Sequence, residues 1–566
     1  MRRMLALAVS MTAMMAGHAA MAAASCPNPA FASEARTAIK AYVDGDVFSG
    51  AVLVAVDDQP VLRQGVGLAD RELGVANTPE TRFRIGSITK QFTATAILQL
   101  AEAGKLSIDD PVSKYYAAAP ASWAKVTVRT LLTHTSGIPT YTAIPGFFDS
   151  TARLPHTPEE LIRLTQDKPL EFEPGTQFAY DNTGYVILGY IIEKVSGQTY
   201  ADYLQSHIFG PLGMTGSGYD SFSRIIPGRA SGYEQGPTGW RNAAFLDMSG
   251  PFSAGALYSD VDDFVKWDRA LNAGTLLSAA SLKAMVTDYG HHYGFGWTID
   301  QKWGQDRIWH NGGINGFVSS FQRYPKARII SVALSNEMLD ADKLAADLAG
   351  LCMGAPVFPK QAQVPAGVLA RYAGDYAPAA GAVISIDVRG DHLVAHVPGQ
   401  QDSLLYPQSP RRFFDRTFDQ TIAFETDAQG RVTDAVVTHN GQDSAYRRIT
   451  AAEAGQIAAA AAARAAAHQA APGSEAALRR VIGEIQGGQP DYSRIGPVLA
   501  AAMRQQQPTL GPMIARLGAI RSMTFVSTGP GGADLFRVQF ENGVLEWGIA
   551  AGPDGIVQTL FLRPAA

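Results

Sequence analysis

The sequence predicts an α+β protein whose largest part is one antiparallel sheet beside a helical insertion. Strand-like apolar runs occur near the beginning of the chain, at residues 51–56 and 61–68, and return at residues 293–334. Between them, residues 87–281 show mostly helical patterns broken by Gly- and Pro-rich loops. Strands at both ends of a helical middle imply that the late strands complete a sheet begun by the early ones.

The elements of this first part, residues 25–354, follow from local patterns. A helix is predicted at residues 31–45, and the turn residues Asp57-Asp58-Gln59-Pro60 join the first two strands into a hairpin. The returning strands are predicted at residues 293–299, 306–309, 316–324 and 328–334, and a helix follows at residues 340–351.

Two smaller units follow a linker at residues 355–365. Residues 366–450 are β-rich, a sandwich or a barrel, and residues 474–566 are a small α+β unit. An alanine-rich helical connector at residues 451–473 joins them, because alanine is the best helix former and Pro472-Gly473 ends the run. The β-rich unit has predicted strands at 383–388, 393–397, 422–425 and 431–437, and the last unit has them at 522–527, 534–540, 544–549 and 557–562.

The composition is that of a folded protein acting on something small. Of 566 residues, 46% are hydrophobic and 17% are charged, which excludes disorder for the bulk of the chain. The 47 Lys and Arg residues against 52 Asp and Glu residues leave a net charge of −5, without the basic footprint of a nucleic-acid binder. We therefore expect a small-molecule or peptide substrate and no nucleic-acid partner.

The N-terminus predicts export. Arg2 and Arg3 precede an apolar run at residues 4–16, and small residues continue to Ala24, which is typical of a signal peptide at residues 1–24. The run is too short to span a bilayer, and no later run suggests a membrane segment. We expect a periplasmic or secreted protein. A lipoprotein anchored at Cys26 is less favoured, because the preceding residues lack the leucine usual at such sites.

Cys26 and Cys352 are the only cysteines of the chain. Cysteine pairs of exported proteins tend to be oxidised, so we predict a disulfide that joins the two ends of the first part. The alternative is two unrelated thiols.

The strongest candidate for chemistry is Ser87 with Lys90. The two residues lie one turn apart on the same face of a predicted helix, and the apolar face of that helix continues in the following residues. A serine at a helix start lies at the positive end of the helix dipole, with its own N–H free for an anion. A partly desolvated lysine can have its pKa lowered toward neutrality. The alternative is an N-cap serine with a surface lysine, and a second pair, Ser122/Lys125, lacks the amphipathic helix.

Tyr180 and Asn182 form the second candidate element. They lie in a predicted loop before a helix, where side chains can reach into a cleft. A phenol beside a lysine is expected to have a lowered pKa and to exchange protons with a serine hydroxyl. The alternative is that Asn182 caps the helix and Tyr180 only packs.

The third element is His310-Asn311-Gly312-Gly313. The glycines lie between two predicted strands and allow a substrate backbone to approach closely, so Asn311 and Gly312 are candidate substrate-binding residues. An edge strand here could bind an extended substrate by strand addition. The backbone N–H groups of Ser87 and Gly313 would then hold an oxyanion. Similar tripeptides at His292, His439 and Lys302 lie in less suitable contexts. No metal or cofactor motif accompanies these residues.

Taken together, the three elements resemble the serine β-lactamase and penicillin-binding protein superfamily. Within it, the chain looks like the class C β-lactamase-related, S12-type serine hydrolases, which carry Ser-x-x-Lys, Tyr-x-Asn and His-x-Gly or Lys-x-Gly. The resemblance spans about residues 31–354 and implies a β-lactamase/transpeptidase-like fold. It extends to four further segments, which are Leu131–Gly137, Gly210–Met214, Ser253–Leu257 and Tyr293–Trp297. His134, in the first of them, is expected to be structural.

The resemblance implies that Ser87 forms an acyl-enzyme, with Lys90 and Tyr180 sharing proton transfer and Asn182 orienting Lys90 and the substrate. Which of Lys90 and Tyr180 is the formal base stays open. Because His310 stands where many relatives carry lysine, carboxylate recognition is expected to be weaker or pH-dependent.

The leading function is hydrolysis of an amide or ester, most simply as a peptidase on small or D-residue-containing peptides. A β-lactamase, a carboxylesterase and a sensor that is acylated without turnover are the alternatives. The sequence sets neither the oligomeric state nor the role of the two C-terminal units. Small β units behind such domains reach over the cleft in some relatives.

Overall fold

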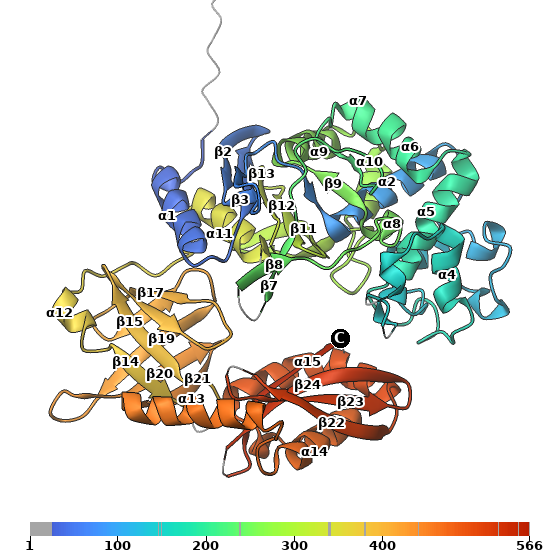
Figure 1. Ribbon diagram of the computed structural model, residues 1–566. Helices are drawn as coiled ribbons and strands as arrows, with labels where there is room; N and C mark the ends of the chain where they lie inside the picture. The colour runs from blue at the N-terminus through green and yellow to red at the C-terminus, as the bar shows by residue number, and fades with distance from the viewer. Residues whose placement is uncertain are drawn as a thin grey trace, which may run out of the picture.

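A computed structural model of the chain describes residues 25–564, apart from 145, 149, 237–238, 338–340, 379–380, 440, 530 and 553. The predicted signal peptide, residues 1–24, lies outside the described residues. Three units follow one another along the chain (Figure 1). None of the helices in the described ranges is long and apolar enough to cross a membrane.

A six-stranded antiparallel sheet organises the first unit. Its order is β10-β11-β12-β13-β1-β2, so the late strands complete the sheet begun by the early hairpin, as predicted. Strand β13 pairs with β1 from Gly50↔Ser335 to Val56↔Ile329. The strands are β1 (Gly50–Val56), β2 (Gln59–Val66), β10 (Thr298–Lys302), β11 (Gln305–Ile314), β12 (Phe317–Tyr324) and β13 (Ile329–Ser335).

Both faces of this sheet are covered, which explains the unbroken apolar run of β1. All residues of β1 are buried. Since successive side chains point to opposite faces, Val52 and Val54 pack with helices α1 (Phe31–Asp44) and α11 (Ala341–Met353). Leu53 packs on the other side with the helical insertion.

The helical insertion places α2 at its centre, packed against α5 and α8. Nearly every residue of α2 is buried, so this helix is fixed on all sides. The longer helices are α2 (Thr89–Glu102), α4 (Pro158–Gln166), α5 (Asn182–Ser196), α9 (Val261–Ala273) and α10 (Ala279–Met285). The short helical elements are η1 (Gly86–Ile88), η2 (Val112–Lys114), η3 (Ala121–Trp123), α3 (Val128–Leu132), η4 (Tyr141–Ala143), η5 (Thr151–Arg153), α6 (Tyr200–Leu204), η6 (Gln205–Phe209), α7 (Gly210–Leu212) and α8 (Phe252–Gly255). Short strands between them are β3 (Leu68–Asp70), β4 (Val75–Ala76), β5 (Phe83–Arg84), β6 (Gly218–Tyr219), β7 (Tyr233–Gly236), β8 (Gly239–Asn242) and β9 (Leu257–Ser259).

The predicted disulfide between Cys26 and Cys352 is confirmed. It joins the segment before α1 to the end of α11.

The second unit is a closed eight-stranded barrel. Four strands predicted from the sequence belong to it, and four more, β14, β17, β18 and β21, complete it. In β18, Arg412 is exposed while Phe413 and Phe414 are buried. The strands are β14 (Gly374–Ala377), β15 (Ile384–Arg389), β16 (His392–His396), β17 (Ser403–Pro407), β18 (Arg412–Asp415), β19 (Gln420–Thr426), β20 (Val432–His439) and β21 (Gln442–Ile449), preceded by α12 (Ala366–Leu369).

The third unit packs two helices on a four-stranded sheet of order β22-β23-β24-β25. The alanine-rich helix α13 (Ala451–Ala466) leads into it and ends earlier than predicted. Arg516, the last residue of α15, forms an ion pair of 2.5 Å with Glu171 of the first unit. Its elements are α14 (Ser474–Gln486), η7 (Tyr492–Arg494), α15 (Pro497–Arg516), β22 (Ile520–Thr528), β23 (Asp534–Phe540), β24 (Gly543–Ala551) and β25 (Val557–Pro564). The mixed α and β class with a separate barrel agrees with the predicted fold class.

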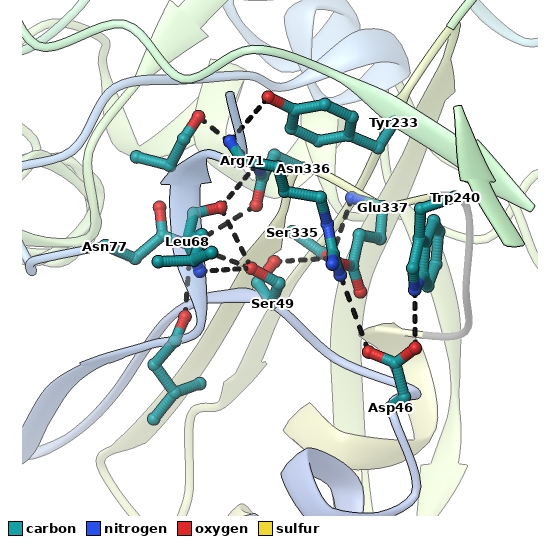
Figure 2. A network of polar contacts seen from close by, with 12 residues as sticks. Asp46, Ser49, Leu68, Arg71, Asn77, Tyr233, Trp240, Ser335, Asn336 and Glu337 are labelled. Atoms are coloured by element: carbon teal, nitrogen blue, oxygen red, sulfur yellow. Dashed lines mark hydrogen bonds and ion pairs between the residues drawn. The ribbon is translucent and has the colours of Figure 1, made fainter. Parts of the chain in front are cut away.

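A polar network fixes the β7–β8 hairpin to the large sheet (Figure 2). Arg71 donates to the carboxylate of Glu337, which is fully buried, and its guanidinium lies 4.8 Å from the ring centroid of Trp240. Trp240 in turn donates to Asp46 at 2.5 Å. Burial raises the pKa of Glu337 to about 7 despite the ion pair with Arg71. The side-chain amide of Gln401 in the barrel donates to the Asp46 carbonyl, so the network also contacts the second unit.

Candidate active site

Ser87 lies in the 3₁₀ turn η1, directly before α2. Gly86, the first residue of this turn, has a φ of +49°, a backbone conformation that favours glycine. The first N–H groups of a helix have no partner within the helix, and the helix dipole is positive at this end. The Ser87 N–H is therefore suited to stabilise a developing oxyanion, as the sequence indicated.

Lys90 lies one turn further, entirely buried, and contacts Ser87 as predicted. Its Nζ lies 3.0 Å from Ser87 Oγ, 2.8 Å from Asn182 Oδ1 and 2.9 Å from the carbonyl oxygen of Ala254. Burial lowers the pKa of Lys90 from 10.5 to about 7, although the charge of Asp181 opposes this shift. A substantial fraction of the amine is therefore neutral near pH 7.

The three contacts of Lys90 fix the direction of its lone pair. A neutral amine donates two hydrogen bonds and accepts one. The Asn182 Oδ1 and Ala254 carbonyl oxygens can only accept, so they take the two N–H groups. The lone pair of neutral Lys90 then points at Ser87 Oγ, where it can accept the hydroxyl proton.

Tyr180 approaches Ser87 from the loop before α5. The Ser87 hydroxyl lies close enough to the Tyr180 hydroxyl to favour the ionised form of the phenol, and Lys90 Nζ lies 4.7 Å from the Tyr180 ring centroid. Part of the ring remains open to solvent, with 38% of the residue exposed. Burial raises the pKa of the Tyr180 hydroxyl above its ordinary value of 10. The expectation that Lys90 lowers this pKa is wrong, because desolvation of the phenolate outweighs the interaction with Ser87, which lowers the pKa, and the negative charge of Asp181 raises the pKa further.

Asn182 is the first residue of α5, and Asp181 caps the helix. The Asp181 carboxylate accepts from the N–H of Gly184 at 2.9 Å. The alternative in which Asn182 caps the helix is therefore wrong, and its side chain is free to accept from Lys90 and donate to Thr142 at 3.1 Å. Burial raises the pKa of Asp181 to about 8. Asp181 was not singled out from the sequence, although an Asx residue before a helix signals a cap.

His134 packs against the loop that carries Tyr180 and is hydrogen-bonded to it. Its Nδ1 accepts from the Asp181 N–H at 3.0 Å, and its ring centroid lies 4.3 Å from that of Tyr180. Its carbonyl oxygen accepts from the Ala179 N–H at 3.0 Å. These contacts agree with the structural role expected for this histidine.

His310 is buried and has partners on both ring nitrogens. Nε2 lies 2.9 Å from the Tyr293 hydroxyl, and Nδ1 lies 2.6 Å from the Asn311 carbonyl. Burial lowers the pKa of His310 to about 3, so the ring is neutral at physiological pH. The expected pH-dependent recognition of a carboxylate by His310 is not supported, because the ring is neither charged nor free.

The neighbouring glycines have different surroundings. A Cβ on Gly312 would lie 1.9 Å from the Ile85 carbonyl, while one on Gly313 would meet nothing within 4 Å. Gly312 thus allows β11 to contact the segment that carries Ser87. The Asn311 amide donates to Asp342 at 2.8 Å, and neither Asn311 nor Gly312 lines the pocket described below.

Strand β11 has an open edge where it passes Ser87. Its pairing with β10 ends at Trp309, whereas its pairing with β12 continues to Ile314. Ile314 and Phe317 close the hairpin turn, so Gly313 and Val318 form the next, non-hydrogen-bonded pair. The Gly313 N–H then points away from β12, toward the open edge.

A pocket of about 320 Å³ opens beside Ser87, and we call it the Ser87 pocket. Its walls come from η1, residues 141–142 and 147–148, the start of α5, residues 246–255 and the end of β11 with the turn that follows it. It is lined by Gly86, Ser87, Tyr141, Thr142, Phe147, Phe148, Asn182, Leu246, Pro251, Ala254, Gly255, Gly313, Ile314 and Asn315. None of these described residues comes from the barrel or the third unit.

The other candidate residues lie elsewhere. Lys125 is exposed and pairs with Glu173 at 2.6 Å, and His292 is exposed and pairs with Asp288 at 3.5 Å. Within the described ranges, no group of three or more His, Cys, Asp and Glu residues is arranged to hold a metal ion.

Comparison with known proteins agrees with this geometry. The model of the family described as Beta-lactamase matches residues 35–351. The chain is 36% identical over 262 residues to the protein PbpX of Bacillus subtilis (strain 168), covering 46% of this chain and 64% of PbpX. It is 27% identical over 336 residues to the D-aminopeptidase of Gluconobacter oxydans (strain 621H), covering 57% of this chain and 62% of that enzyme. The chain thus spans slightly less than two thirds of the length of these relatives.

Among solved structures, an octameric penicillin-binding protein homologue from Pyrococcus abyssi superposes with a TM-score of 0.54 at 26% identity. The match covers 74% of this chain and the whole of that one.

Proposed function

Because this chain belongs to the beta-lactamase family, we propose that it is a serine hydrolase in which Ser87 forms an acyl-enzyme. The single observation that carries the proposal is the contact of Ser87 Oγ with Lys90 Nζ at 3.0 Å, beside the Tyr180 hydroxyl and at the wall of a pocket. A nucleophile in contact with a base and with a second proton carrier is the arrangement that acyl transfer requires.

Acylation begins with proton transfer from Ser87 to the neutral amine of Lys90. Ser87 Oγ attacks the substrate carbonyl carbon, and the N–H groups of Ser87 and Gly313 hold the oxyanion. Tyr180, kept neutral by its raised pKa, donates its hydroxyl proton to the leaving nitrogen or oxygen and regains one from the Lys90 ammonium. The carbon–leaving-group bond breaks and the serine ester remains. Water releases the acyl group by the reverse sequence of proton transfers.

The substrate is an amide or ester of a small molecule or peptide, most simply a peptide with D-residues. The D-aminopeptidase relative supports this choice. A β-lactamase and a carboxylesterase use the same acyl-enzyme chemistry, and a sensor that is acylated without turnover is the alternative outside the enzyme class.

Export to the periplasm or beyond belongs to the proposal. Its supports are the N-terminal sequence pattern and the disulfide between Cys26 and Cys352, which forms and persists in oxidising compartments. A cysteine lipidated on its sulfur cannot also form this disulfide, which argues against a lipoprotein anchor at Cys26.

A turnover panel tests the function. Nitrocefin, p-nitrophenyl acetate, D- and L-alanine amides and a D-Ala-D-Ala peptide are assayed with the wild type and with Ser87→Ala. We expect steady hydrolysis of at least one amide or ester, lost in Ser87→Ala. A burst of one equivalent without a steady state would favour the sensor. Equal rates in both proteins would refute the proposal.

A further inference from the structure

We propose that the side chain of the acyl group transferred to Ser87 is uncharged and apolar and that this side chain occupies the Ser87 pocket. This inference rests on the proposed function and specifies its substrate class. It concerns the group on the acyl side of the scissile bond and does not specify the leaving group.

The walls of the Ser87 pocket are mostly apolar and include three aromatic residues. Phe147, Phe148, Tyr141, Leu246 and Ile314 face it, while the Tyr141 hydroxyl is already donated to the Gly250 carbonyl at 2.7 Å. A volume of about 320 Å³ is at the small end of ligand pockets. It has room for one aromatic or aliphatic side chain.

No charged side chain is among the described residues that line the pocket. The nearby titratable groups are engaged elsewhere. All donors of Lys90 have partners at the base of the site, and His310 is neutral with both nitrogens paired. A carboxylate or ammonium entering the pocket would lose its hydration without gaining an ion pair, which is costly.

The pocket is preformed, because hydrogen bonds tie its walls together. The Asn315 amide donates to the Ala244 carbonyl at 2.9 Å, which joins the β11–β12 turn to the segment that carries Leu246. The Asp247 N–H donates to the Ala152 carbonyl at 2.9 Å, which joins that segment to the loop that carries Phe147 and Phe148. The shape of the pocket, and with it the choice of acyl group, is thus set before substrate binds.

The test is a series of p-nitrophenyl esters with one leaving group, so that kcat/KM reports the acyl group alone. From acetate to butyrate we expect kcat/KM to rise about fourfold for each methylene that the pocket buries. The pentanoate is then compared with the glutarate monoester, which carries a carboxylate in place of the terminal methyl group, and the hexanoate with the 6-aminohexanoate. We expect each charged ester to be at least about tenfold slower than its neutral counterpart.

Phe148 offers a variant that is expected to fold, because 43% of it is exposed. Phe148→Lys places an ammonium at the pocket and should raise the rate of the glutarate ester relative to the pentanoate by about tenfold or more. Phe148→Ala should lower the pentanoate rate without raising the rate of the glutarate ester relative to the pentanoate. Leu73→Lys, at an exposed leucine outside the pocket, controls for net charge and should leave the ratio unchanged.

The outcomes separate this inference from the proposed function. Ser87-dependent hydrolysis with equal rates for charged and neutral acyl groups would overturn the inference and leave the hydrolase intact. An unchanged ratio in Phe148→Lys would also overturn it. If folded protein shows no Ser87-dependent hydrolysis or acylation with any ester, including the acetate, the proposed function itself fails.

Discussion

Two adjacent glycines allow a sharp test of how β11 positions the site. Gly312→Ala would place a methyl group 1.9 Å from the Ile85 carbonyl, about 1.5 Å closer than ordinary contact at 3.4 Å. Strand β11 must then move away from the segment that carries Ser87, and the Gly313 N–H moves with it. Since a misplacement of about 1 Å can cost roughly 10²-fold in rate, we expect kcat/KM to fall by about 10²-fold or more.

Gly313→Ala is the matched control, because its methyl group meets nothing within 4 Å and the backbone N–H is retained. Because Gly313 lines the Ser87 pocket, both variants are assayed with p-nitrophenyl acetate, whose acyl group is small, and we expect Gly313→Ala to lose less than about tenfold in kcat/KM. Esterase assays are combined with circular dichroism and thermal unfolding, since overpacking at Gly312 also costs about 1–3 kcal/mol of stability. A folded Gly312→Ala protein with wild-type activity, or an equal loss in both variants, would refute this account of β11.

Three further predictions follow from the same structure. With a neutral ester, kcat/KM should rise with pH through an apparent pKa near 7, because the neutral Lys90 amine is the base; a flat profile between about pH 5 and 9 would contradict this role. Reduction of the Cys26–Cys352 disulfide, which joins residues 326 apart, should lower the unfolding free energy by about 2–4 kcal/mol; an unchanged Tm in reductant would contradict this. Folding raises the pKa of Glu337 from 4.5 to about 7, so the stability that this group contributes is present below about pH 4.5 and is lost as pH rises to about 7. Glu337→Gln does not titrate, so its Tm relative to the wild type should increase from about pH 5 to pH 8; a constant difference would contradict the raised pKa.

The sequence predicted β1 and β13 well because these strands are buried on both faces and therefore appear as continuous apolar runs. The strand predicted at residues 293–299 is wrong in its bounds, because β10 runs from Thr298 to Lys302 at the exposed edge of the sheet, where no apolar run marks it. The end of β11 was predicted at residue 309, yet the strand continues through the glycines to Ile314. The backbone pairs with β12 there, although the glycines lack the side-chain alternation from which a strand is predicted.

Half of the barrel strands were not predicted, for a physical reason. Strand β18 has only four residues, including Arg412 and Asp415, and β21 alternates half-buried and exposed positions with many polar side chains. In a closed barrel every strand has two neighbours, so ladder hydrogen bonds stabilise such segments. That closure is a tertiary property and is not visible in a local pattern.

In the candidate site too, local features were predicted correctly and features that depend on distant segments were not. The spacing of Ser87 and Lys90 was sufficient to predict their contact, because it depends on helix geometry alone. The pKa of Tyr180 was predicted in the wrong direction, because its burial depends on segments distant in the chain. The hydrogen bond between Tyr293 and His310 was not predicted for the same reason.

The identity of the nucleophile is tested most directly by covalent labelling. The wild-type protein is treated with a fluorophosphonate probe, its intact mass is measured, and the modified peptide is sequenced. The account predicts one adduct per chain, located on Ser87, and no adduct in a folded Ser87→Ala variant. An adduct on another residue, or undiminished labelling of Ser87→Ala, would contradict it.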